Sequence, residues 1–264
     1  MAIMGPKTLF YDTDVASDLG DRLVSKDYLL DVYPEIIPES KRTSPGLWCC
    51  GYNNYGQLGL GDTTDRSSPV QIGLLTNWKK VSVGLYFTTF IKTDGSSWSS
   101  GLNDVGQLGQ GDTTNRSSPV QIGNLTNWKT ISTGDSHTCA VKTDGTLWTW
   151  GVNTYGQLGT EDVTSRSSPV QIGNLTNWKT ASNGQEHSLL IKTDTSIWGF
   201  GRNNYGQLGL SDTTDKSSPV QIGALTNWKQ VDSGKNHSVA IKIDGTLWGW
   251  GYNNYGQLGL SDTT

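Results

Sequence analysis

The chain has 264 residues, of which 34% are apolar and only 17% are charged, and its net charge is −4. Eleven tryptophans and ten tyrosines supply large apolar side chains, which excludes a disordered chain. The net charge excludes the broad cationic field that nucleic acids and anionic membranes attract, and no apolar run approaches the roughly 20 residues of a membrane-spanning helix. Residues 1–10 lack the basic start and apolar run of a secretory signal. We therefore expect a soluble protein made in a cytoplasm, with neither nucleic acid binding nor membrane insertion.

Residues 1–46 form an N-terminal arm that belongs to no repeat and carries five basic and eight acidic residues. Ser25 is placed to cap a short helix, which we expect to run from Lys26 to Tyr33 and to end at Pro34. The arm has more apolar surface than so short a segment buries alone, contributed by Leu23, Val24, Tyr28, Leu29, Val32, Ile36 and Ile37. We therefore expect residues 1–46 to anchor the chain to other proteins of a larger assembly.

The remaining sequence, residues 47–264, repeats with a constant period of 50 residues. Tyr-Gly-Gln-Leu-Gly at 55–59 returns at 155–159, 205–209 and 255–259, and with valine in first place at 105–109. Ser-Pro-Val-Gln-Ile-Gly at 68–73 returns from positions 118, 168 and 218. The near-identity of the repeats indicates duplication of one unit, so the chain contains four full units and a partial fifth.

Each unit predicts four short β-strands. In the unit that begins at Trp78 they span Trp78–Ser82, 88–92, Ser97–Ser100 and Pro119–Ile122. Asp94 and Gly95 favour a two-residue hairpin turn between the second and third strands, and a proline suits a strand at the edge of a sheet. Four antiparallel strands that recur radially form one blade of a β-propeller, so we predict an all-β propeller with four-stranded antiparallel blades.

A longer pattern then carries a family resemblance. Leu-Trp-x-Trp-Gly-x-Asn-x-x-Gly-Gln-Leu-Gly at 147–159 is followed by the proline-led strand and by Ser-x-Gly-x-x-His at 182–187. The pattern resembles the repeat of the regulator of chromosome condensation (RCC1) family over residues 47–264. The resemblance implies a propeller that commonly closes with about seven blades. We therefore expect an incomplete or truncated ring, and a natural protein that continues beyond Thr264 with further units.

Glycine and histidine recur at positions with structural explanations. Gly56 and Gly59 permit a turn with positive φ and a close backbone approach. No helix follows to turn this loop into a phosphate-binding site. One repeat position holds His137, His187 and His237, and Phe87 in another unit. A position that accepts phenylalanine is expected to be packed between blades rather than to act in catalysis.

Aspartate, tryptophan and cysteine receive similar interpretations. One aspartate recurs in each unit, without the clustered carboxylates of a calcium loop, and is expected to bond turn backbone. These residues are Asp62, Asp112, Asp162, Asp212 and Asp262. The periodic tryptophans are expected to supply much of the inter-blade core, at about 2 to 3 kcal/mol for each buried indole. The three cysteines lack the spacing of a disulfide pair or a metal site, and they are Cys49, Cys50 and Cys139.

Binding residues are expected where the units differ, because packing leaves the surface loops of a repeat scaffold free to vary. The pair after the glycine of Gly-x-x-His differs in every unit: Leu85 and Tyr86, Asp135 and Ser136, Gln185 and Glu186, Lys235 and Asn236. Residues around the glycine-rich loop, such as 60–61 and 160–161, differ as well, and drift in unconstrained loops gives the same pattern. The serine, histidine and aspartate side chains that could act in catalysis recur from unit to unit, and none of them has a partner that is specific to one unit. We therefore expect no enzyme activity, no metal and no cofactor.

These features favour a non-enzymatic structural and binding protein, anchored by its arm and displaying its propeller. RCC1-like repeats with a short arm and no secretion signal resemble proteins of tailed bacteriophages. This resemblance implies a virion or tail-associated component, assembled in the host cytoplasm, that contacts a protein or a host-surface receptor. The alternative is guanine-nucleotide exchange or regulatory scaffolding of the RCC1 type, although the chain lacks a protruding loop and basic tails. A third interpretation, an enzyme inhibitor like the family's β-lactamase-binding member, requires secretion.

Overall fold

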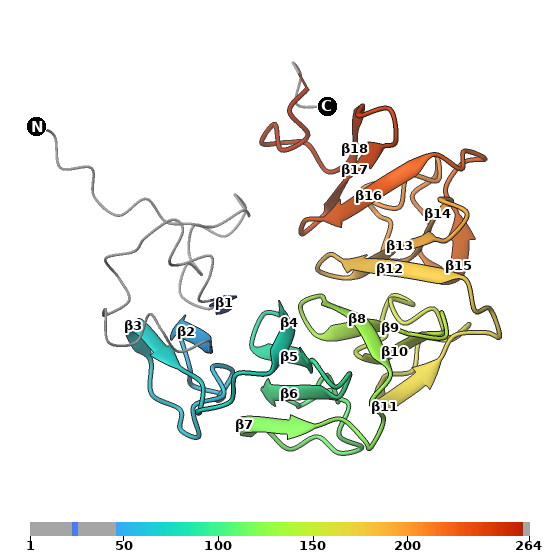
Figure 1. Ribbon diagram of the computed structural model, residues 1–264. Helices are drawn as coiled ribbons and strands as arrows, with labels where there is room; N and C mark the ends of the chain where they lie inside the picture. The colour runs from blue at the N-terminus through green and yellow to red at the C-terminus, as the bar shows by residue number, and fades with distance from the viewer. Residues whose placement is uncertain (1–22, 26–45, 261–264) are drawn as a thin grey trace, which may run out of the picture.

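The computed structural model describes residues 23–25 and 46–260, and within these ranges it contains eighteen β-strands and no helix. The strands form five antiparallel sheets that follow one another in chain order around an open arc (Figure 1). The prediction of an all-β repeat protein with four-stranded antiparallel blades is confirmed, since three of the sheets have four strands. Within the described part of the chain, no helix could cross a membrane.

The strand bounds repeat from sheet to sheet. The first sheet contains β1 (Leu23–Ser25), β2 (Leu47–Gly51) and β3 (Arg66–Gln71). The second blade contains β4 (Trp78–Val83), β5 (Phe87–Lys92), β6 (Ser97–Gly101) and β7 (Arg116–Gln121). The third blade contains β8 (Trp128–Thr133), β9 (His137–Lys142), β10 (Leu147–Gly151) and β11 (Arg166–Gln171). The fourth blade contains β12 (Trp178–Asn183), β13 (His187–Lys192), β14 (Ile197–Gly201) and β15 (Lys216–Gln221). The last sheet contains β16 (Trp228–Ser233), β17 (His237–Lys242) and β18 (Leu247–Gly251).

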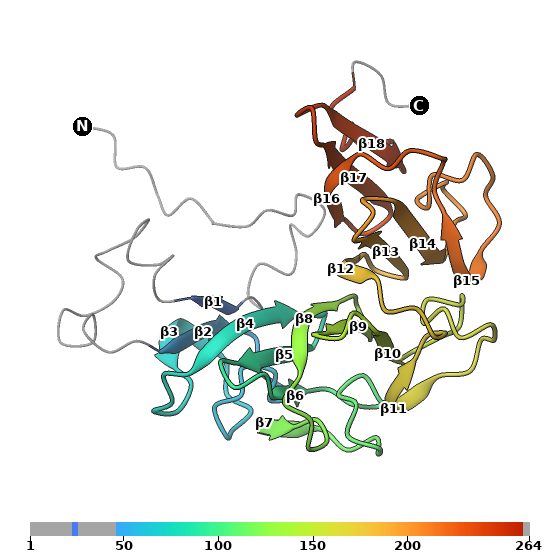
Figure 2. The same cartoon turned by 45° about the vertical axis from the view of Figure 1, so that its right-hand side comes forward.

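Each strand of a blade pairs with the next strand along the chain. The first strands, β4, β8, β12 and β16, line the inside of the arc, and the fourth strands, β7, β11 and β15, lie at its periphery (Figure 1). Figure 2, turned by 45° about the vertical axis, shows the first and last sheets at the two ends of the arc. The first strand of one blade therefore lies beside the first strand of the next.

The hairpin between the second and third strands is longer than predicted. Lys92 N–H donates to the Ser96 carbonyl and Gly95 N–H donates to the Lys92 carbonyl, both at 3.0 Å. The loop therefore has three residues, 93–95, and ends with Gly95 at φ +81°. A type I turn followed by a left-handed residue is the usual three-residue hairpin, so the predicted two-residue turn was wrong by one residue.

The fourth strand is also longer than predicted. β7 begins at Arg116, three residues before Pro119, because Arg116 pairs with Gly101 across a register shift that follows Ser99. The strand pairs with β6 alone, so Pro119 lies in an edge strand, where its missing N–H removes no ladder hydrogen bond.

The first sheet takes one strand from the N-terminal arm. β1 pairs with β2 in the register Val24 to Trp48, and β5 pairs with β6 in the equivalent register Phe90 to Trp98. β1 therefore holds the second-strand position beside β2 and β3. The helix predicted from Lys26 to Tyr33 lies outside the described residues.

The hydrophobic core lies between neighbouring blades. One cluster joins Cys139 and Leu147 of the third blade to Trp178, Leu190 and Phe200 of the fourth, and each of these side chains is at most 2% exposed. Burial of such side chains contributes about 1.5 to 3 kcal/mol each. Burial also raises the pKa of the Cys139 thiol to about 11, so this thiol stays protonated at neutral pH.

Tryptophans of the first and third strands hold a lysine between them. Lys142 Nζ lies 3.5 Å from the ring centroid of Trp148 and 4.8 Å from that of Trp128. Burial lowers the pKa of Lys142, and the cation–π contact with a tryptophan contributes about 0.5 to 2 kcal/mol. Trp150 is fully buried between blades as expected, whereas Trp148 is half-buried because its ring covers the lysine. The arrangement recurs at Lys92, Lys192 and Lys242.

Candidate functional site

The loops of the blades form two faces, because successive antiparallel strands run in opposite directions. The upper face carries the short loops between first and second strands, such as 84–86, and the long loops between third and fourth strands, such as 102–115. The lower face carries the loops between second and third strands and the connections between blades. All eight residues predicted to bind partners lie in short loops of the upper face.

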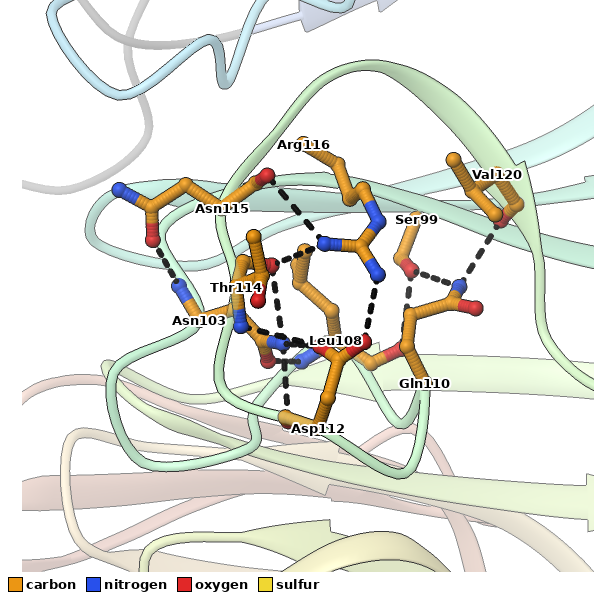
Figure 3. A network of polar contacts seen from close by, with 9 residues as sticks. All are labelled: Ser99, Asn103, Leu108, Gln110, Asp112, Thr114, Asn115, Arg116 and Val120. Atoms are coloured by element: carbon orange, nitrogen blue, oxygen red, sulfur yellow. Dashed lines mark hydrogen bonds and ion pairs between the residues drawn. The ribbon is translucent and has the colours of Figure 1, made fainter.

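A hydrogen-bond network recurs in the long loops, and Figure 3 shows it in the second blade. Asn103 Nδ2 donates to the carbonyl and to Oδ1 of Asp112, both at 3.0 Å, and Thr114 N–H donates to Oδ1 at 2.9 Å. Arg116 Nη2 pairs with Asp112 Oδ2 at 2.6 Å. The Thr114 backbone bond and the Arg116 guanidinium lower the pKa of Asp112. The repeated aspartate is therefore a turn residue, as predicted, although Asp262 lies outside the described residues.

The glycines of the long loop allow it to lie against the next blade. Gly106 has φ +80°, and a Cβ on it would lie 2.4 Å from the Cα of Ser167 in β11. Gly111 N–H donates to the Ser167 carbonyl at 2.8 Å. Gly56 has the same relation to Ser117, so the structural role predicted for these glycines is confirmed.

The short loops form an arc of backbone hydrogen bonds that crosses four blades. Leu85 N–H donates to the Asp135 carbonyl at 3.2 Å, and Asp135 N–H donates to the Gln185 carbonyl at 3.3 Å. Gln185 N–H donates to the Lys235 carbonyl, also at 3.3 Å. Residues 50 positions apart in the sequence are thus adjacent in space. Their side chains, all at least partly exposed, present an apolar, an anionic, an amide and a cationic group in succession.

Tyr86, the last residue of its short loop, contacts the long loops of two blades. The Tyr86 carbonyl accepts a hydrogen bond from Leu102 N–H of its own blade at 2.9 Å. Its ring centroid lies 5.2 Å from that of Tyr55 and 5.9 Å from that of Tyr52, both in the preceding long loop. Tyr86 therefore completes a cluster of three tyrosines between the first sheet and the second blade.

Between the third and fourth blades, the residues equivalent to Tyr86 and Leu102 are charged: Glu186 and Arg202. Arg202 Nη1 pairs with Glu186 Oε2, and its guanidinium carbon lies 4.6 Å from the ring centroid of Tyr155. The hydrogen bond that Arg202 donates to Glu186 raises the pKa of Arg202. Between the fourth blade and the last sheet, Tyr205 and Tyr252 pack with ring centroids 4.8 Å apart. These three interfaces thus carry a tyrosine cluster, an ion pair beside a tyrosine, and a tyrosine pair on the upper face.

Every tyrosine of the described residues lies in a loop of the upper face, and every tryptophan lies in a strand. Tyrosine is enriched at protein interfaces because its ring buries a large apolar area while its hydroxyl stays hydrated. Sequence reasoning found only one of these residues, Tyr86. The signal for Tyr52 and Tyr252 was their repeat position, which holds Tyr, Leu, Val, Arg and Tyr in turn. The other four occupy a nearly constant position of the repeat, which unit-to-unit differences do not single out. The tyrosines are Tyr52, Tyr55, Tyr86, Tyr155, Tyr205, Tyr252 and Tyr255.

The repeated histidine links neighbouring blades. His137 Nε2 lies 3.0 Å from Ser188 Oγ of the next blade, and Ser188 Oγ donates to the Gln157 carbonyl at 3.1 Å. The serine therefore accepts from Nε2–H, which makes His137 a neutral imidazole protonated at Nε2. His187 stands in the same relation to Ser238. Burial lowers the pKa of His137 and of His187 to about 3, and the predicted packing between blades is confirmed.

The residues predicted to anchor the arm are divided by the structure. Leu23 and Val24 lie in β1, so the non-repeat sequence contributes to the first sheet. The other five lie outside the described residues: Tyr28, Leu29, Val32, Ile36 and Ile37.

The family model described as regulator of chromosome condensation (RCC1) repeat matches residues 46–91, 94–141, 144–191 and 194–241. A second model of the same repeat matches residues 78–107, 128–157 and 228–257. A comparison of the sequence with curated proteins gave no significant match.

Solved structures with this fold include yeast RCC1 (Prp20) bound to Kap60, with a TM-score of 0.74 and 21% identity over 82% of this chain and 54% of that chain. Prp20p from Saccharomyces cerevisiae gives a TM-score of 0.73 and 22% identity over 83% of this chain and 56% of that chain. Human WBSCR16 gives a TM-score of 0.67 and 20% identity over 76% of this chain and 54% of that chain. The chain spans just over half the length of these relatives, and at such identities the likeness shows the fold alone. Since the repeat model matches most of the sequence and the blades have the corresponding strands, the chain belongs to the regulator of chromosome condensation (RCC1) repeat family.

Proposed function

We propose that the chain is a non-enzymatic binding scaffold whose upper face contacts a protein partner. The observation that carries this proposal is the gathering of all seven described tyrosines and all eight unit-specific residues on that one face. Membership of the RCC1 repeat family supports a scaffold for protein contacts.

The geometry of the upper face suits recognition. The backbone arc through Leu85, Asp135 and Gln185 places unlike side chains at neighbouring positions. The networks around the repeated aspartates hold the long loops beside them. Groups held in place before binding lose little conformational entropy when a partner docks, and tyrosine adds contact area at the cost of only two rotatable bonds.

A finer proposal concerns the assembly. We propose that the protein is a virion or tail-associated component of a bacteriophage, assembled in the host cytoplasm, anchored by residues 1–46 and contacting a host-surface receptor with its upper face. The support is the likeness of RCC1-type repeats with a short arm to phage proteins. Mass spectrometry of gradient-purified virions tests it. We expect peptides of this chain in an amount comparable to the structural proteins, and their absence from infectious particles would contradict the proposal.

The upper face is tested separately from the virion. The double change Tyr52→Ala and Tyr86→Ala removes two rings of the first tyrosine cluster, and we expect it to weaken partner binding at least tenfold because interface tyrosines are common hot spots. Leu125→Ser is the control, since Leu125 is 47% exposed on the lower face. Adsorption of each purified variant to host cells, after circular dichroism has shown an unchanged fold, gives the comparison. Equal adsorption of both variants would refute the upper face as the binding surface.

The anchor is tested by substitutions that spare the first sheet. Changing Tyr28, Leu29, Val32, Ile36 and Ile37 to serine removes apolar side chains proposed to anchor the arm and leaves β1, which pairs with β2, in the chain. We expect this variant to fold and to be missing from assembled particles. Normal incorporation would show that the anchor lies elsewhere.

A second candidate function is guanine-nucleotide exchange or a related regulatory scaffold. It is favoured by the likeness to yeast RCC1, whose structures are described with Kap60 and with binding to Gsp1p and histones. The test is release of a fluorescent guanine nucleotide from a small GTPase in the presence of catalytic amounts of the chain. Acceleration that is lost when Glu186→Ala and Arg202→Ala disturb the upper face would support this function over the first.

A further inference from the structure

A groove of about 430 Å³ lies between the peripheral strands β11 and β15 of the third and fourth blades. Its apolar wall is formed by Ile172, Leu175, Trp178 and Trp198, and its upper end by Thr160 and Glu161 of the long loop. This volume falls within the range of small-molecule sites, which are mostly apolar with a few placed polar groups. The groove contains none of the tyrosines and none of the eight short-loop residues of the upper face.

One short residue accounts for the open space. Leu60 and Leu210, which hold the position of Thr160 in other units, pack against the hydrophobic core. Gln110 fills the position in the second blade, where its Nε2 donates to Ser99 Oγ at 3.0 Å and to the Val120 carbonyl at 3.1 Å (Figure 3).

Thr160 instead turns toward its own loop. Its hydroxyl accepts from Asn153 Nδ2 and donates to Asp162 Oδ1, both at 3.0 Å. The volume that a leucine or glutamine side chain occupies in the other units is therefore left open beside Ile172.

The next residue places a carboxylate at the mouth of this groove. Glu161 has φ +67°, a left-handed conformation that Gly61 and Gly111 hold at the equivalent position without a steric penalty. Its N–H donates to the Ser217 carbonyl at 2.7 Å, which a glycine would also do. Among the residues that the structure describes, the Glu161 side chain forms no ion pair. A strained backbone that presents an unpaired carboxylate at a pocket indicates a ligand group of opposite charge.

Neighbouring groups narrow the chemistry of the occupant. The Arg166 guanidinium is held by Asp162 at 2.6 Å and by the Thr164 carbonyl at 2.7 Å, so it does not compete for Glu161. Addition of a peptide strand to the outer edge of β11 is disfavoured, because the Ser167 carbonyl is used by Gly111 and Pro169 has no N–H.

We propose that this groove binds a small organic cation, with an amidinium or ammonium group paired with Glu161 and a flat apolar body against Ile172, Leu175 and the two tryptophans. Charge complementarity assigns the cationic group, and the volume left by Thr160 assigns the apolar body. The equivalent positions in the other units lack both features, since they hold Leu60, Gln110 or Leu210 in place of the open volume and Gly61, Gly111 or Ser211 in place of the carboxylate.

Benzamidine and its neutral isostere benzamide are the probes. The indole N–H resonances of Trp178 and Trp198 are followed by nuclear magnetic resonance during titration of the full chain, with Trp48 as an internal reference from the first sheet. We expect saturable shifts with benzamidine and at least tenfold weaker binding of benzamide. Absence of saturable shifts with benzamidine, or equal affinity for the two probes, would overturn the proposal.

Two variants separate the site from the fold. Glu161→Gly restores the residue of other units and should weaken benzamidine binding at least tenfold, and Thr160→Leu should abolish it by filling the groove. Both introduce residues that the same fold already holds at these positions, so loss of binding will not reflect unfolding. Gly111→Glu, a carboxylate beside a groove filled by Gln110, is the matched control and should create no second site. Retained affinity in Glu161→Gly or Thr160→Leu would refute the assignment.

Discussion

The third blade and the last sheet have nearly the same sequence and different surroundings. Leu147 opens β10 and is fully buried, whereas Leu247 opens β18 and is 70% exposed. Trp150 and Trp250 nevertheless make the same contact with the preceding blade, because each indole N–H donates to a glutamine carbonyl, at 3.0 and 2.9 Å respectively. Among the described residues, β18 pairs only with β17, while β10 also pairs with β11.

The comparison shows that the residues of each unit make the same contact with the unit before it. Whether the third-strand leucine is buried depends on the unit after it. A repeat protein of this kind gains stability from interfaces between neighbours more than from single units. Identical residues should therefore contribute differently according to the blade in which they lie. The four predictions below test this from the largest expected effect to the smallest.

Acid should weaken the middle blades through their buried histidines. The pKa of His137 and of His187 is lowered from 6.5 to about 3 by burial, so the unfolded chain binds protons between these values that the folded chain does not. Their stabilising contribution is complete above pH 6.5 and is lost as the pH falls toward 3, at about 1.4 kcal/mol per pH unit for each histidine. Urea unfolding at pH 6.5 and 4.5 should differ by about 5 kcal/mol from the two residues together.

The control for this prediction is the double variant His137→Phe and His187→Phe. Phenylalanine already holds the position at Phe87, where it is fully buried. The variant should lose most of the pH dependence between 6.5 and 4.5. An unchanged slope would assign the acid sensitivity to other groups.

The loss of unfolding free energy on truncating the first residue of the third strand should depend on the blade in which it lies. Leu147→Ala removes a fully buried side chain and should cost about 2 to 5 kcal/mol of unfolding free energy. Leu247→Ala, at the matching position, should cost less than about 0.5 kcal/mol because the side chain is already exposed. Denaturant unfolding of both variants makes the comparison, and similar losses would show that Leu247 is covered in solution.

A glycine pair separates backbone strain from contact between blades. Gly106 and Gly206 have φ of +80° and +74°, but a Cβ on Gly106 would lie 2.4 Å from Ser167, and one on Gly206 would meet nothing within 4 Å. Gly106→Ala should therefore cost about 2 to 4 kcal/mol, from strain and overlap, and Gly206→Ala about 1 to 2 kcal/mol, from strain alone. Equal thermal destabilisation would mean that the long loop does not rest on the next blade.

The smallest effect is expected from introducing glycine at Glu161, a position where two other units already hold glycine. Glu161→Gly should raise the unfolding free energy by about 0.5 to 1 kcal/mol, because the left-handed conformation at φ +67° suits glycine better. Ser211→Gly, at φ +61°, should give a similar gain and serves as the matched variant. A loss of stability in Glu161→Gly alone would reveal a stabilising role for this carboxylate in the folded chain.

Much of the fold could be predicted because the repeat multiplies weak signals. Strands near Trp78 and Ser97 were predicted to within one residue of their observed ends, since alternation and bounding glycines recur in every unit. The start of β7 at Arg116 was not predicted, because it depends on a register shift between Ser99 and Gly101 that only pairing reveals. The hairpin at 93–95 was misjudged for a similar reason, since Asp-Gly suits both a two-residue turn and the end of a three-residue loop.

The candidate site was predicted in part. Unit-to-unit differences selected residues such as Leu85 and Tyr86, which the structure places in upper-face loops and whose binding role stays a prediction. Nothing in the pattern showed that Tyr52 and Tyr55 lie against Tyr86. Their proximity arises from packing of one blade on the next. The groove at Thr160 was likewise hidden, because an open volume depends on where neighbouring side chains turn.

The sequence by itself determined the strands of each blade, the glycines of its turns and the aspartate network of its long loops. These features depend on residues within one unit, and they recur from unit to unit. Tertiary structure alone decided which copies are buried, which loop residues become neighbours and where space remains between blades. Those properties depend on a second unit lying beside the first, and local sequence preferences do not encode the distance or orientation between units. Leu147 and Leu247 hold the same position of the repeat, yet Leu147 is buried and Leu247 is exposed, because in the described part of the chain only Leu147 has a following blade packed against it.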